Sequence, residues 1–533
     1  MKRKRMAVIG GGASGCSLLW CMTSQDAPGR RYDVTLFHDE DEVGGHSRTI
    51  PVVFDGAGRG RVAAPGDTGT AYPVDIGVQF VCPSLYPNLY RQLRLPELQH
   101  VRLTRHPALR LSGAFNDELV WGNFPEFQRG ARFTRCLDAQ ARADATRFER
   151  DLHRAPFLKI DGRRVFEMSI GDYLNASGIR RDGNFFRYLL IPYLCIINGY
   201  GTVDLLETTM QDLWPIFTRL PFVQDAGPYG AFLEPGYGWD RFTDGATAWV
   251  RALADLAERR GARVQLAATV TRVERRKDEW IVRWLEGARY GAGGIALEPG
   301  TVRHEQAFDD VVLTTDMTTN LELLDHDQNP FRGPHSQYLS SERFRLLPGV
   351  CYIHQDESLL APSLTDDVED GQFIGYFGWG ERDEGSELYD LPYDLGRTFQ
   401  TYMMHNIMGT PARCYVSMYA EDRIARVPAP EKTIFRRTWR HGRWVASFFR
   451  QGKRELHRVQ GLGNLWFAGN NATVDSEEGA LLSAMIIAAQ AAGYRYPFER
   501  PSLAWVMHGY FHEQMFPLGS NRERLRRLVT GLA

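Results

Sequence analysis

The sequence predicts an α/β fold in which a discontinuous dinucleotide-binding domain is combined with a second, α+β domain. Three observations support this prediction: a glycine-rich turn near the start of the chain, a second glycine pair after the next strand, and strand–helix alternation in three separated blocks. Such alternation is typical of a doubly wound parallel sheet. At 533 residues the chain is longer than a single hydrophobic core usually supports, so we expect two intertwined domains.

The first glycine-rich turn lies within fifteen residues of the start of the chain. An apolar strand that ends at Ile9 leads into the pattern Gly-x-Gly-x-x-Gly over residues 10–15, and a helix of small residues follows. The first glycine permits a tight turn, the second lets the backbone approach a pyrophosphate, and the third lets the helix pack closely on the strand. A second strand over residues 33–37 completes the Rossmann-like pattern, in which the helix N-terminus binds phosphate. The expected cofactor contacts in this turn are Gly10, Gly12, Ala13, Ser14 and Gly15.

Strand–helix alternation continues in two later blocks, which we expect to fold together with the first. The expected boundaries are 1–81, 235–316 and 456–495 for the dinucleotide-binding domain, 82–234 and 317–455 for the substrate domain, and 496–533 for a C-terminal helical tail. The middle block predicts an amphipathic helix over residues 243–260, which Gly261 ends as a C-cap. The strands expected after this helix lie at residues 264–266, 270–273, 280–284 and 310–315, with a hairpin and loop over 278–300.

The composition gives no electrostatic support for a nucleic-acid partner, and we expect none. The formal net charge is −2 and the isoelectric point is about 6.7, so the chain has no basic excess that would attract phosphate backbones. A hydrophobic content of 43% and a charged content of 24% are ordinary for a globular protein. We therefore expect a small molecule as the partner.

The cysteines and the apolar stretches predict a soluble, cytoplasmic protein. The seven cysteines are scattered and form no Cys-x-x-Cys pair, which favours reduced thiols over a disulfide framework or a zinc site. Three consecutive glycines interrupt the apolar stretch after the basic N-terminus, so this stretch does not resemble a secretory signal. The longest apolar run, residues 188–197, is interrupted by Pro192 and is too short to span a membrane.

A second glycine pair follows the second strand, within residues 38–49. This segment resembles the flavin-dependent amine oxidase superfamily, which includes amine oxidases, protoporphyrinogen oxidase, carotenoid desaturases and FAD-dependent fatty-acid isomerases. Members carry an acidic residue at the end of the strand, then two glycines, a basic or polar residue, and a threonine. The resemblance implies that Gly44, Gly45 and His46 lie against the pyrophosphate of FAD. It also implies the two-domain architecture of that superfamily.

One position departs from the pattern of the superfamily. Its acidic residue accepts hydrogen bonds from the adenosine ribose and should fall six positions before Gly44, where this chain has His38. A neutral imidazole nitrogen accepts one hydrogen bond but not the pair that a carboxylate takes. Two alternatives stay open: His38 binds the ribose less tightly, or Asp39 turns in to replace it.

Further segments match the same superfamily. Residues 75–80 resemble its Asp-x-Gly stretch, whose glycine backbone passes the isoalloxazine, and Val270 stands where a family valine binds adenine through its backbone. The strand at 465–467 and the helix that starts at Glu477 resemble the closing motif, whose helix N-terminus faces the flavin pyrimidine and stabilises negative charge there. Asn470 replaces the usual aspartate and retains the ability to bond ribitol or phosphate. The cofactor-binding residues that these segments imply are Gly77, Val78, Gln79, Phe80, Val270, Gly469, Asn470, Glu478 and Ala480.

The substrate half of the sequence favours an apolar substrate over an amine. In the amine oxidase branch, a tyrosine three positions before the closing helix glycine forms one wall of an aromatic cage; Ser476 stands at that position here. The substrate segments contain many large apolar side chains, most of which we expect in the core, while any that line a pocket would suit an apolar ligand. These side chains are Phe185, Phe186, Tyr193, Ile196, Ile197, Tyr200, Trp214, Phe217, Tyr376, Phe377, Trp379, Tyr402 and Met403.

Other groups of polar residues carry weaker signals. His508 and His512 have the helical spacing of a metal pair but no evident third ligand, so we expect solvated or capping histidines and no metal. The acidic run 39–42 is expected to be a solvated loop. Glu477 and Glu478 suit a helix N-terminus, and Glu478 also matches a family glutamate near the flavin, which leaves a structural and a functional role open. No Ser-His-Asp or Cys-His arrangement is evident from sequence.

These observations predict an FAD-dependent oxidoreductase that abstracts hydride from a C–H bond of a fairly apolar organic substrate, giving desaturation or double-bond isomerisation. A flavin-dependent amine or amino-acid oxidase that produces imine and hydrogen peroxide is the first alternative. A non-catalytic FAD-binding partner protein is the second. No residue is assigned as catalytic acid or base. The tail is expected to be a docking helix, with contact to a membrane surface as the alternative.

Overall fold

The fold is described from a computed structural model. The described residues are 3–24, 32–83, 85–105, 111–115, 118–122, 138–181, 183–186, 190, 206–211, 213, 240–287, 302–340, 343–344, 346–359, 373–381, 397–406, 409–420, 427–442 and 452–517.

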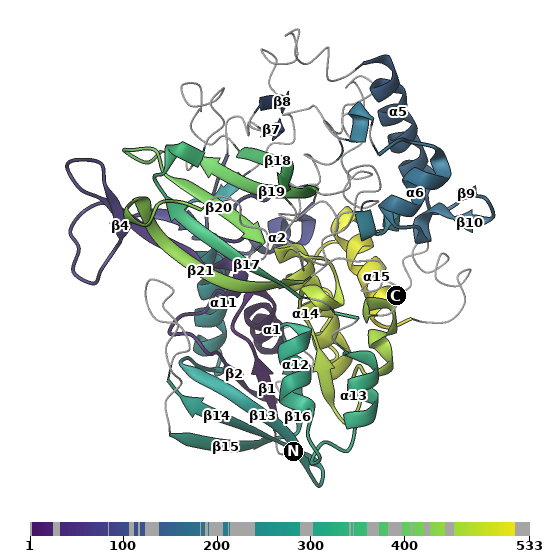
Figure 1. The fold of residues 1–533 in the computed structure, drawn as a ribbon. Helices are drawn as coiled ribbons and strands as arrows, with labels where there is room; N and C mark the ends of the chain where they lie inside the picture. Colours follow the sequence, from purple (N-terminus) through teal and green to yellow (C-terminus); the bar gives the residue numbers. More distant parts are fainter. Residues whose placement is uncertain are drawn as a thin grey trace.

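A five-stranded parallel sheet takes its strands from three distant stretches of the chain, as the sequence predicted (Figure 1). Its order is β12-β2-β1-β16-β22, and every pair is parallel. The strands are β1 (Lys4–Ile9), β2 (Tyr32–Phe37), β12 (Arg263–Gln265), β16 (Asp310–Leu313) and β22 (Leu465–Phe467). The C-terminal halves of β1 and β2 are fully buried, which explains why they read as continuous apolar runs. The predicted α/β, Rossmann-like fold is confirmed.

Three helices pack together against this sheet, with α1 (Ala13–Thr23) in contact with both α11 (Ala246–Arg259) and α14 (Glu477–Ala492). The predicted amphipathic helix is α11, and Gly261 follows it at φ +99, a conformation that glycine adopts readily. By contrast, α14 is apolar around its whole circumference and is buried from its first residue. Such a helix is buried in the core of a large protein.

Two antiparallel three-stranded sheets accompany the parallel sheet. One contains β13 (Ala268–Arg276), β14 (Glu279–Glu286) and β15 (Arg303–Phe308); the other contains β3 (Thr49–Phe54), β4 (Gly60–Val62) and β5 (Tyr72–Asp75). The strands predicted at 264–266, 270–273, 280–284 and 310–315 correspond to β12, β13, β14 and β16. The expected hairpin is formed by β14 and β15, and residues 288–300 between them lie outside the described part.

A seven-stranded mixed sheet builds the upper half of the molecule in Figure 1. Its order is β21-β17-β20-β19-β18-β7-β8, antiparallel except for the parallel pair β18–β7. The strands are β7 (Leu111–Phe115), β8 (Glu118–Gly122), β17 (Leu346–His354), β18 (Phe373–Glu381), β19 (Arg397–Asn406), β20 (Tyr415–Ala420) and β21 (Thr433–Gly442). They come from both segments predicted to form the substrate domain, although the domain boundaries themselves stay a prediction.

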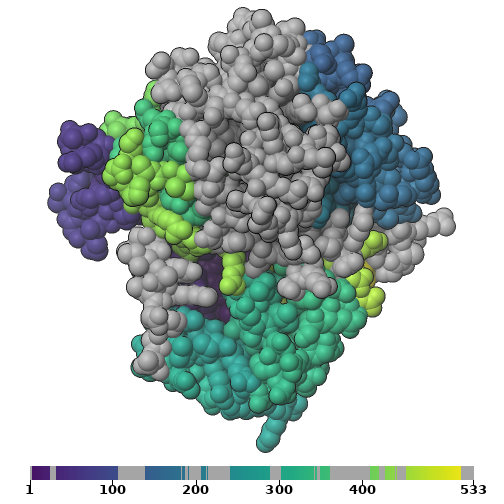
Figure 2. Space-filling model, in the orientation of Figure 1, coloured from purple at the N-terminus to yellow at the C-terminus, as the bar shows by residue number. Residues whose placement is uncertain are grey.

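Shorter elements surround these sheets. They are α2 (Pro87–Gln92), β6 (Leu103–Arg105), α5 (Ala139–Arg154), β9 (Lys159–Ile160), β10 (Arg163–Arg164), α6 (Ile170–Ser177), β11 (Asp240–Phe242), α12 (Met317–Leu324), α13 (Arg332–Tyr338) and α15 (Leu503–Met515). The region of α5 and α6 and the region of β4 form opposite flanks of the upper half (Figures 1 and 2).

The C-terminal helix α15 docks on α2 and α14, which confirms a docking helix for this part of the tail. Met507, Phe511 and Met515 form its buried stripe at a spacing of four residues. Residues 518–533 lie outside the described part, so lipid contact by their arginines stays a prediction. Among the described helices, none combines the length and apolarity needed to cross a membrane.

Candidate dinucleotide-binding site

The two glycine motifs of the sequence lie directly against each other. The Gly44 amide donates a hydrogen bond to the Gly11 carbonyl at 2.9 Å, and Gly12 and Gly44 form an isolated parallel bridge. Gly45 has a φ of +58, and a Cβ on it would come within 3.1 Å of the Gly12 Cα. The structure therefore joins the first and second motifs into one continuous glycine backbone surface.

The glycines of the first motif are required for two different reasons. A Cβ on Gly15 would lie 1.9 Å from the Gly10 carbonyl oxygen, so the close contact between α1 and the turn excludes any side chain. Gly10 has a φ of +113 and donates its amide to the carbonyl oxygen of Phe37. A Cβ on Gly12, however, would come no nearer than 3.8 Å to any atom of the described residues, which is an ordinary van der Waals contact. Packing within the described structure therefore does not require glycine at position 12, whereas a close approach of a pyrophosphate to the backbone does.

The N-terminus of α1 completes this surface. Gly12 precedes α1, and within the described structure no side chain caps this end, so the first amides keep their capacity to bind an anion. Ser14 in the first turn contacts Ser483 of α14 through their hydroxyl groups at 3.2 Å. The Ser483 hydroxyl also accepts a hydrogen bond from the Gly469 amide at 2.8 Å. The third predicted block is thereby attached to the first turn.

His38 lies at the end of β2, where the superfamily has its acidic residue. Its Nδ1 accepts a hydrogen bond from the Gly11 amide at 3.2 Å, and burial lowers the pKa of the imidazole, which is therefore neutral. The proton of the neutral ring is then on Nε2, a buried atom that has no partner within the described structure. Because the Gly11 amide occupies Nδ1, the ring would offer the ribose the N–H of Nε2 and not an acceptor; that His38 binds the ribose stays a prediction.

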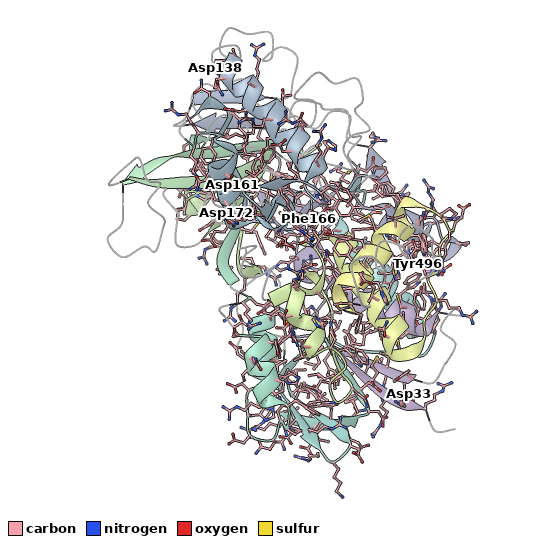
Figure 3. All side chains as sticks on the ribbon, turned by 90° about the vertical axis from the view of Figure 1, so that its right-hand side faces the viewer. Asp33, Asp138, Asp161, Phe166, Asp172 and Tyr496 are labelled. Atoms are coloured by element: carbon pink, nitrogen blue, oxygen red, sulfur yellow. The ribbon has the colours of Figure 1, made fainter. Side chains whose placement is uncertain are left out.

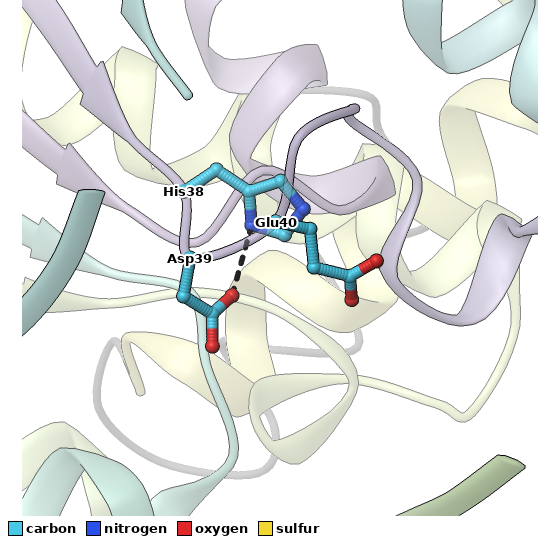
Figure 4. A group of neighbouring side chains, drawn as sticks. All are labelled: His38, Asp39 and Glu40. Atoms are coloured by element: carbon cyan, nitrogen blue, oxygen red, sulfur yellow. Dashed lines mark ion pairs between the residues drawn. The ribbon is translucent and has the colours of Figure 1, made fainter. Parts of the chain in front are cut away.

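Asp39 does not replace His38 in this structure. Figure 4 shows its carboxylate beside the His38 ring, with Asp39 Oδ1 3.3 Å from Nδ1, while the Glu40 carboxylate points away from this contact. One polar atom from each of the three side chains lies within 4.8 Å of the others. This group is nevertheless a poor binding site for a cation, because Nδ1 already accepts a hydrogen bond from the Gly11 amide and Glu40 is paired with Arg437 and Arg48.

The prediction of a solvated loop over residues 39–42 is wrong for Glu40. Glu40 is 4% exposed and forms an ion pair with Arg437 of β21, which is 7% exposed. Arg48 lies 3.8 Å from the same carboxylate and also pairs with Glu42 at 3.0 Å. The acidic run therefore connects the parallel sheet to the seven-stranded sheet.

The segment after β5 runs beside the second glycine motif, as its resemblance implied. The amides of Ile76 and Val78 donate to the carbonyls of Arg48 and His46 at 3.1 and 3.4 Å. This pairing places residues 77–80 next to the glycine surface. The side-chain oxygen of Gln79 is buried and has no partner within the described residues.

Asp75 positions the N-terminus of α11. Its carboxylate accepts hydrogen bonds from the Thr49 hydroxyl at 2.6 Å and the Ala246 amide at 2.8 Å. Burial raises the pKa of Asp75 to about 6, although these two hydrogen bonds oppose the shift.

Two residues that the resemblance implies as cofactor contacts, Glu478 and Asn470, form hydrogen bonds with other protein groups. Glu478 accepts hydrogen bonds from the amides of Asn88 and Leu89 at the start of α2, and from the Asn88 side chain at 2.7 Å. The Asn470 amide nitrogen donates to Asp475. Both described roles are structural, so neither supports a direct cofactor contact.

Two further implied residues lie near the motifs. Val270 follows closely on Ala268, whose amide donates to the carbonyl of His38 at 2.8 Å. Ala480 belongs to the first turn of α14.

For the adjacent Glu477 the sequence predicts no more than a favourable interaction with the helix dipole, but the structure places it at the glycine motifs. Its Oε1 accepts a hydrogen bond from Ser47 at 3.0 Å. Ser476 caps α14 by accepting from the Gly479 amide at 3.0 Å. In the sequence, Glu477 stands out only as a second carboxylate beside Glu478 at the start of the helix, where one acidic residue is enough to interact with the helix dipole.

The fold also brings together a His-Ser-Asp group that sequence separation concealed. His354 Nε2 lies 2.7 Å from the Ser417 hydroxyl, and Nδ1 accepts from the backbone amide of Asp356 at 3.1 Å. With Nδ1 accepting, Nε2 carries the proton and donates it to Ser417, the reverse of what activates a serine. Both His354 and Ser417 are fully buried. This group links strands β17 and β20 by a hydrogen bond, and its arrangement does not activate Ser417 as a nucleophile.

The two histidines of α15, which were expected to be solvated or capping, are half-buried. His508 is half-buried and lies 4.8 Å from the Tyr496 ring, and burial lowers its pKa to about 3. His512 contacts Gln490 at 2.9 Å.

Of the expected pocket residues, Phe185 and Phe186 are buried. The side chains of the others lie outside the described part: Tyr193, Ile196, Ile197, Tyr200, Trp214, Phe217, Tyr376, Phe377, Trp379, Tyr402 and Met403.

A surface cavity of about 490 Å³ lies elsewhere, on the β9–β10 hairpin, lined by Lys159, Arg163 and Arg164 among others. Arg163 pairs with Asp172 at 2.8 Å and Arg164 with Glu167 at 3.9 Å, so most of its charge is compensated. Figure 3 shows Asp161 and Asp172 in the upper half, far from Asp33 at the base of β2. This cavity is separate from the glycine surface.

Comparison with known proteins agrees with this geometry. Residues 8–94 match the model of the NAD(P)-binding Rossmann-like domain family. No curated protein matches the chain in sequence.

Solved structures resemble the chain over almost its full length. A CLA-producing fatty acid isomerase from P. acnes aligns with a TM-score of 0.56 at 15% identity, covering 91% of this chain and 98% of its own. Wild-type putrescine oxidase bound to putrescine gives a TM-score of 0.52 at 13% identity, with coverages of 92% and 98%. Cyclohexylamine oxidase from Brevibacterium oxydans gives 0.51 at 12% identity, with coverages of 92% and 99%. The chain thus has the two-domain fold of these isomerase and oxidase structures, the fold that the resemblance of its motifs implies.

Proposed function

We propose that the chain is an FAD-dependent oxidoreductase that abstracts hydride from a C–H bond of an apolar substrate, giving desaturation or double-bond isomerisation. The observation that supports it most is the glycine surface formed by Gly12, Gly44 and Gly45, because packing among the described residues does not explain the glycine at position 12. A dinucleotide is the ligand that such a surface at the start of a helix suits.

The residues present fit FAD at three points along the molecule. The N–H of His38 Nε2 is a buried donor that would bind an oxygen of the adenosine ribose. The Gly12 and Gly45 backbones and the first amides of α1 would hold the pyrophosphate. The side-chain oxygens of Gln79 and Glu477 that have no partner among the described residues would face the remainder of the cofactor. Bound FAD would supply a hydride acceptor, while the protein orients the cofactor and excludes water.

The apolar substrate is favoured by the local role of Ser476. Its hydroxyl caps α14, so the position that carries a cage tyrosine in amine oxidases is occupied here by a helix cap. The isomerase that shares the fold acts on a fatty acid, as its name states. Amine oxidation is the second candidate, because two amine oxidases share the fold to a similar degree. A non-catalytic FAD-binding role is the third.

The test is anaerobic reduction of the purified, FAD-loaded protein by a panel of amines, unsaturated fatty acids and polyenes. We expect the flavin absorbance to bleach, or the double bonds of the product to shift position, only with the apolar members. Bleaching by an amine with stoichiometric peroxide release in air would replace the proposal by amine oxidation. A bound flavin that no donor reduces and that moves no double bond would indicate a non-catalytic protein.

A further inference from the structure

Glu477 is a buried carboxyl group with one bonded and one unbonded oxygen. It is 2% exposed although it is the first residue of α14. Oε1 accepts the Ser47 hydroxyl at 3.0 Å, whereas Oε2 is buried and has no partner within the described structure. Unpartnered buried polar atoms are rare in folded proteins, which suggests that an additional group satisfies this oxygen.

The contacts around Glu477 place it along the dinucleotide path. At one end His38 contacts Gly11, next Gly12 contacts Gly44, and then Ser47, three residues further along the same turn, contacts Glu477. A dinucleotide that has its ribose at His38 and its pyrophosphate at Gly12 would extend beyond the pyrophosphate toward Glu477. For FAD that portion is the ribityl chain and the flavin ring.

The hydrogen bond from Ser47 determines which oxygen of a protonated Glu477 carries the hydrogen. Because the Ser47 hydroxyl donates to Oε1, the acid hydrogen belongs on Oε2, the oxygen without a partner. Burial raises the pKa of Glu477 to about 8. Hydrogen bonding by its own backbone amide and by the Ser47 hydroxyl lowers the pKa, and the carboxylates of Asp475 and Asp75 raise it. Tyr86 also lies within the electrostatic range of this group.

We propose that Glu477 binds FAD as a neutral carboxylic acid and donates the hydrogen on Oε2 to an acceptor atom on the flavin side of the pyrophosphate. This inference rests on the proposed function, because it requires bound FAD. Glu477 acts as a positioning residue: as an acid it supplies a hydrogen bond to the cofactor, and as a carboxylate it would repel negative charge on the reduced ring.

The experiment follows the flavin of the full-length holoprotein between about pH 6.5 and about pH 9.5, the range that brackets the Glu477 pKa. In the wild type we expect one ionisation in the flavin absorption spectrum. Above the midpoint of the oxidised form, flavin reduction should take up additional protons, up to one per flavin, because the added negative charge keeps Glu477 protonated in the reduced form. Glu477→Gln keeps a donor but cannot ionise, so both effects should vanish. Glu286→Gln removes an exposed carboxylate and should retain both.

A second variant keeps the test decisive if Glu477→Gln fails to fold. Ser47→Ala removes the hydrogen bond that lowers the pKa of Glu477, so the spectroscopic midpoint should move to higher pH. A yellow wild type without this ionisation, or an ionisation that persists in Glu477→Gln, would overturn the inference and leave FAD binding intact. A wild type that remains colourless with excess FAD would overturn the proposed function, and the inference with it.

Discussion

At the scale of single residues, one glycine of the first motif is required for folding and another is expected to be required only for cofactor binding. Gly15 is needed by the protein itself, since a Cβ there would overlap the Gly10 carbonyl at 1.9 Å. Gly12 is not needed by packing, because its Cβ would be 3.8 Å from the nearest atoms. Its backbone, at φ −81 and ψ −172, is also accessible to alanine. The two positions therefore make a matched pair.

Gly12→Ala should weaken FAD binding while the fold persists. The new methyl group would occupy the space of the pyrophosphate, so we expect the dissociation constant of FAD to rise at least about tenfold. The free energy of unfolding of the apoprotein should change by less than about 1 kcal/mol. Gly15→Ala should instead destabilise the apoprotein by roughly 2 kcal/mol or more. Fluorescence titration with FAD and urea unfolding measure the two effects, and equal FAD affinity in wild type and Gly12→Ala would contradict this account.

Glu477 and Asp75 should make the apoprotein less stable as pH rises. Their pKa values in the folded state are raised to about 8 and about 6, above unfolded values near 4. Between about pH 4 and these values the folded state binds more protons than the unfolded state, so the free energy of unfolding falls with increasing pH. Glu477→Gln should flatten this decline from about pH 4.5 to about pH 8. Urea unfolding at several pH values tests it; an unchanged slope would count against a raised pKa.

At the scale of elements, a carboxylate from one helix caps the start of another. Glu478 in the first turn of α14 accepts two backbone amides and one side-chain amide from the start of α2. The first amides of a helix have no partner within it, so this contact fixes α2 against α14.

Glu478→Ala should therefore destabilise the protein by roughly 2–4 kcal/mol, because buried amides lose a charged acceptor. Glu499 offers the control, since it also touches α2, through Arg91 at 3.7 Å, but its side chain is 82% exposed. We expect Glu499→Ala to cost less than about 1 kcal/mol. Chemical unfolding of the two variants provides the comparison, and equal losses would show that the buried contact adds nothing.

Several elements of the dinucleotide-binding half could be predicted from the sequence. Local patterns predicted β1, α1, β2, α11 and the closing helix, because turn glycines and periodicity act over a few residues. The partners of the buried polar groups could not be predicted. Glu40 and Arg437 are separated by 397 residues, and His354 and Ser417 by 63, so only the folded chain brings them together. The occupied Nδ1 of His38 was hidden for the same reason, since its donor is a backbone amide of another turn.

At the scale of the whole molecule, a buried ion pair joins the parallel sheet to the seven-stranded sheet. Glu40 follows β2, and Arg437 belongs to β21. Burial opposes ionisation of Glu40, but Arg437 beside it keeps its pKa below the ordinary value. This stabilisation is present above the unfolded-state pKa and is lost as pH falls through the folded-state pKa.

Arg437→Met should cost roughly 3–5 kcal/mol, because it leaves the buried Glu40 charge with less compensation. Arg440→Met on the same strand is the control, since Arg440 is 52% exposed and lies 3.9 Å from Glu322. The control should lose less than about 1 kcal/mol. Differential unfolding of the two variants at pH 7 distinguishes them, and a loss at Arg437 no larger than at Arg440 would rule out this role of the ion pair.

The central claim, that three distant stretches of the chain together bind one FAD, is tested most directly by titrating purified apoprotein with FAD in a calorimeter while recording its visible spectrum. The account predicts saturation at one FAD per chain, with the flavin absorbance bands perturbed on binding. A protein that stays colourless and gives no binding heat at saturating FAD would contradict it.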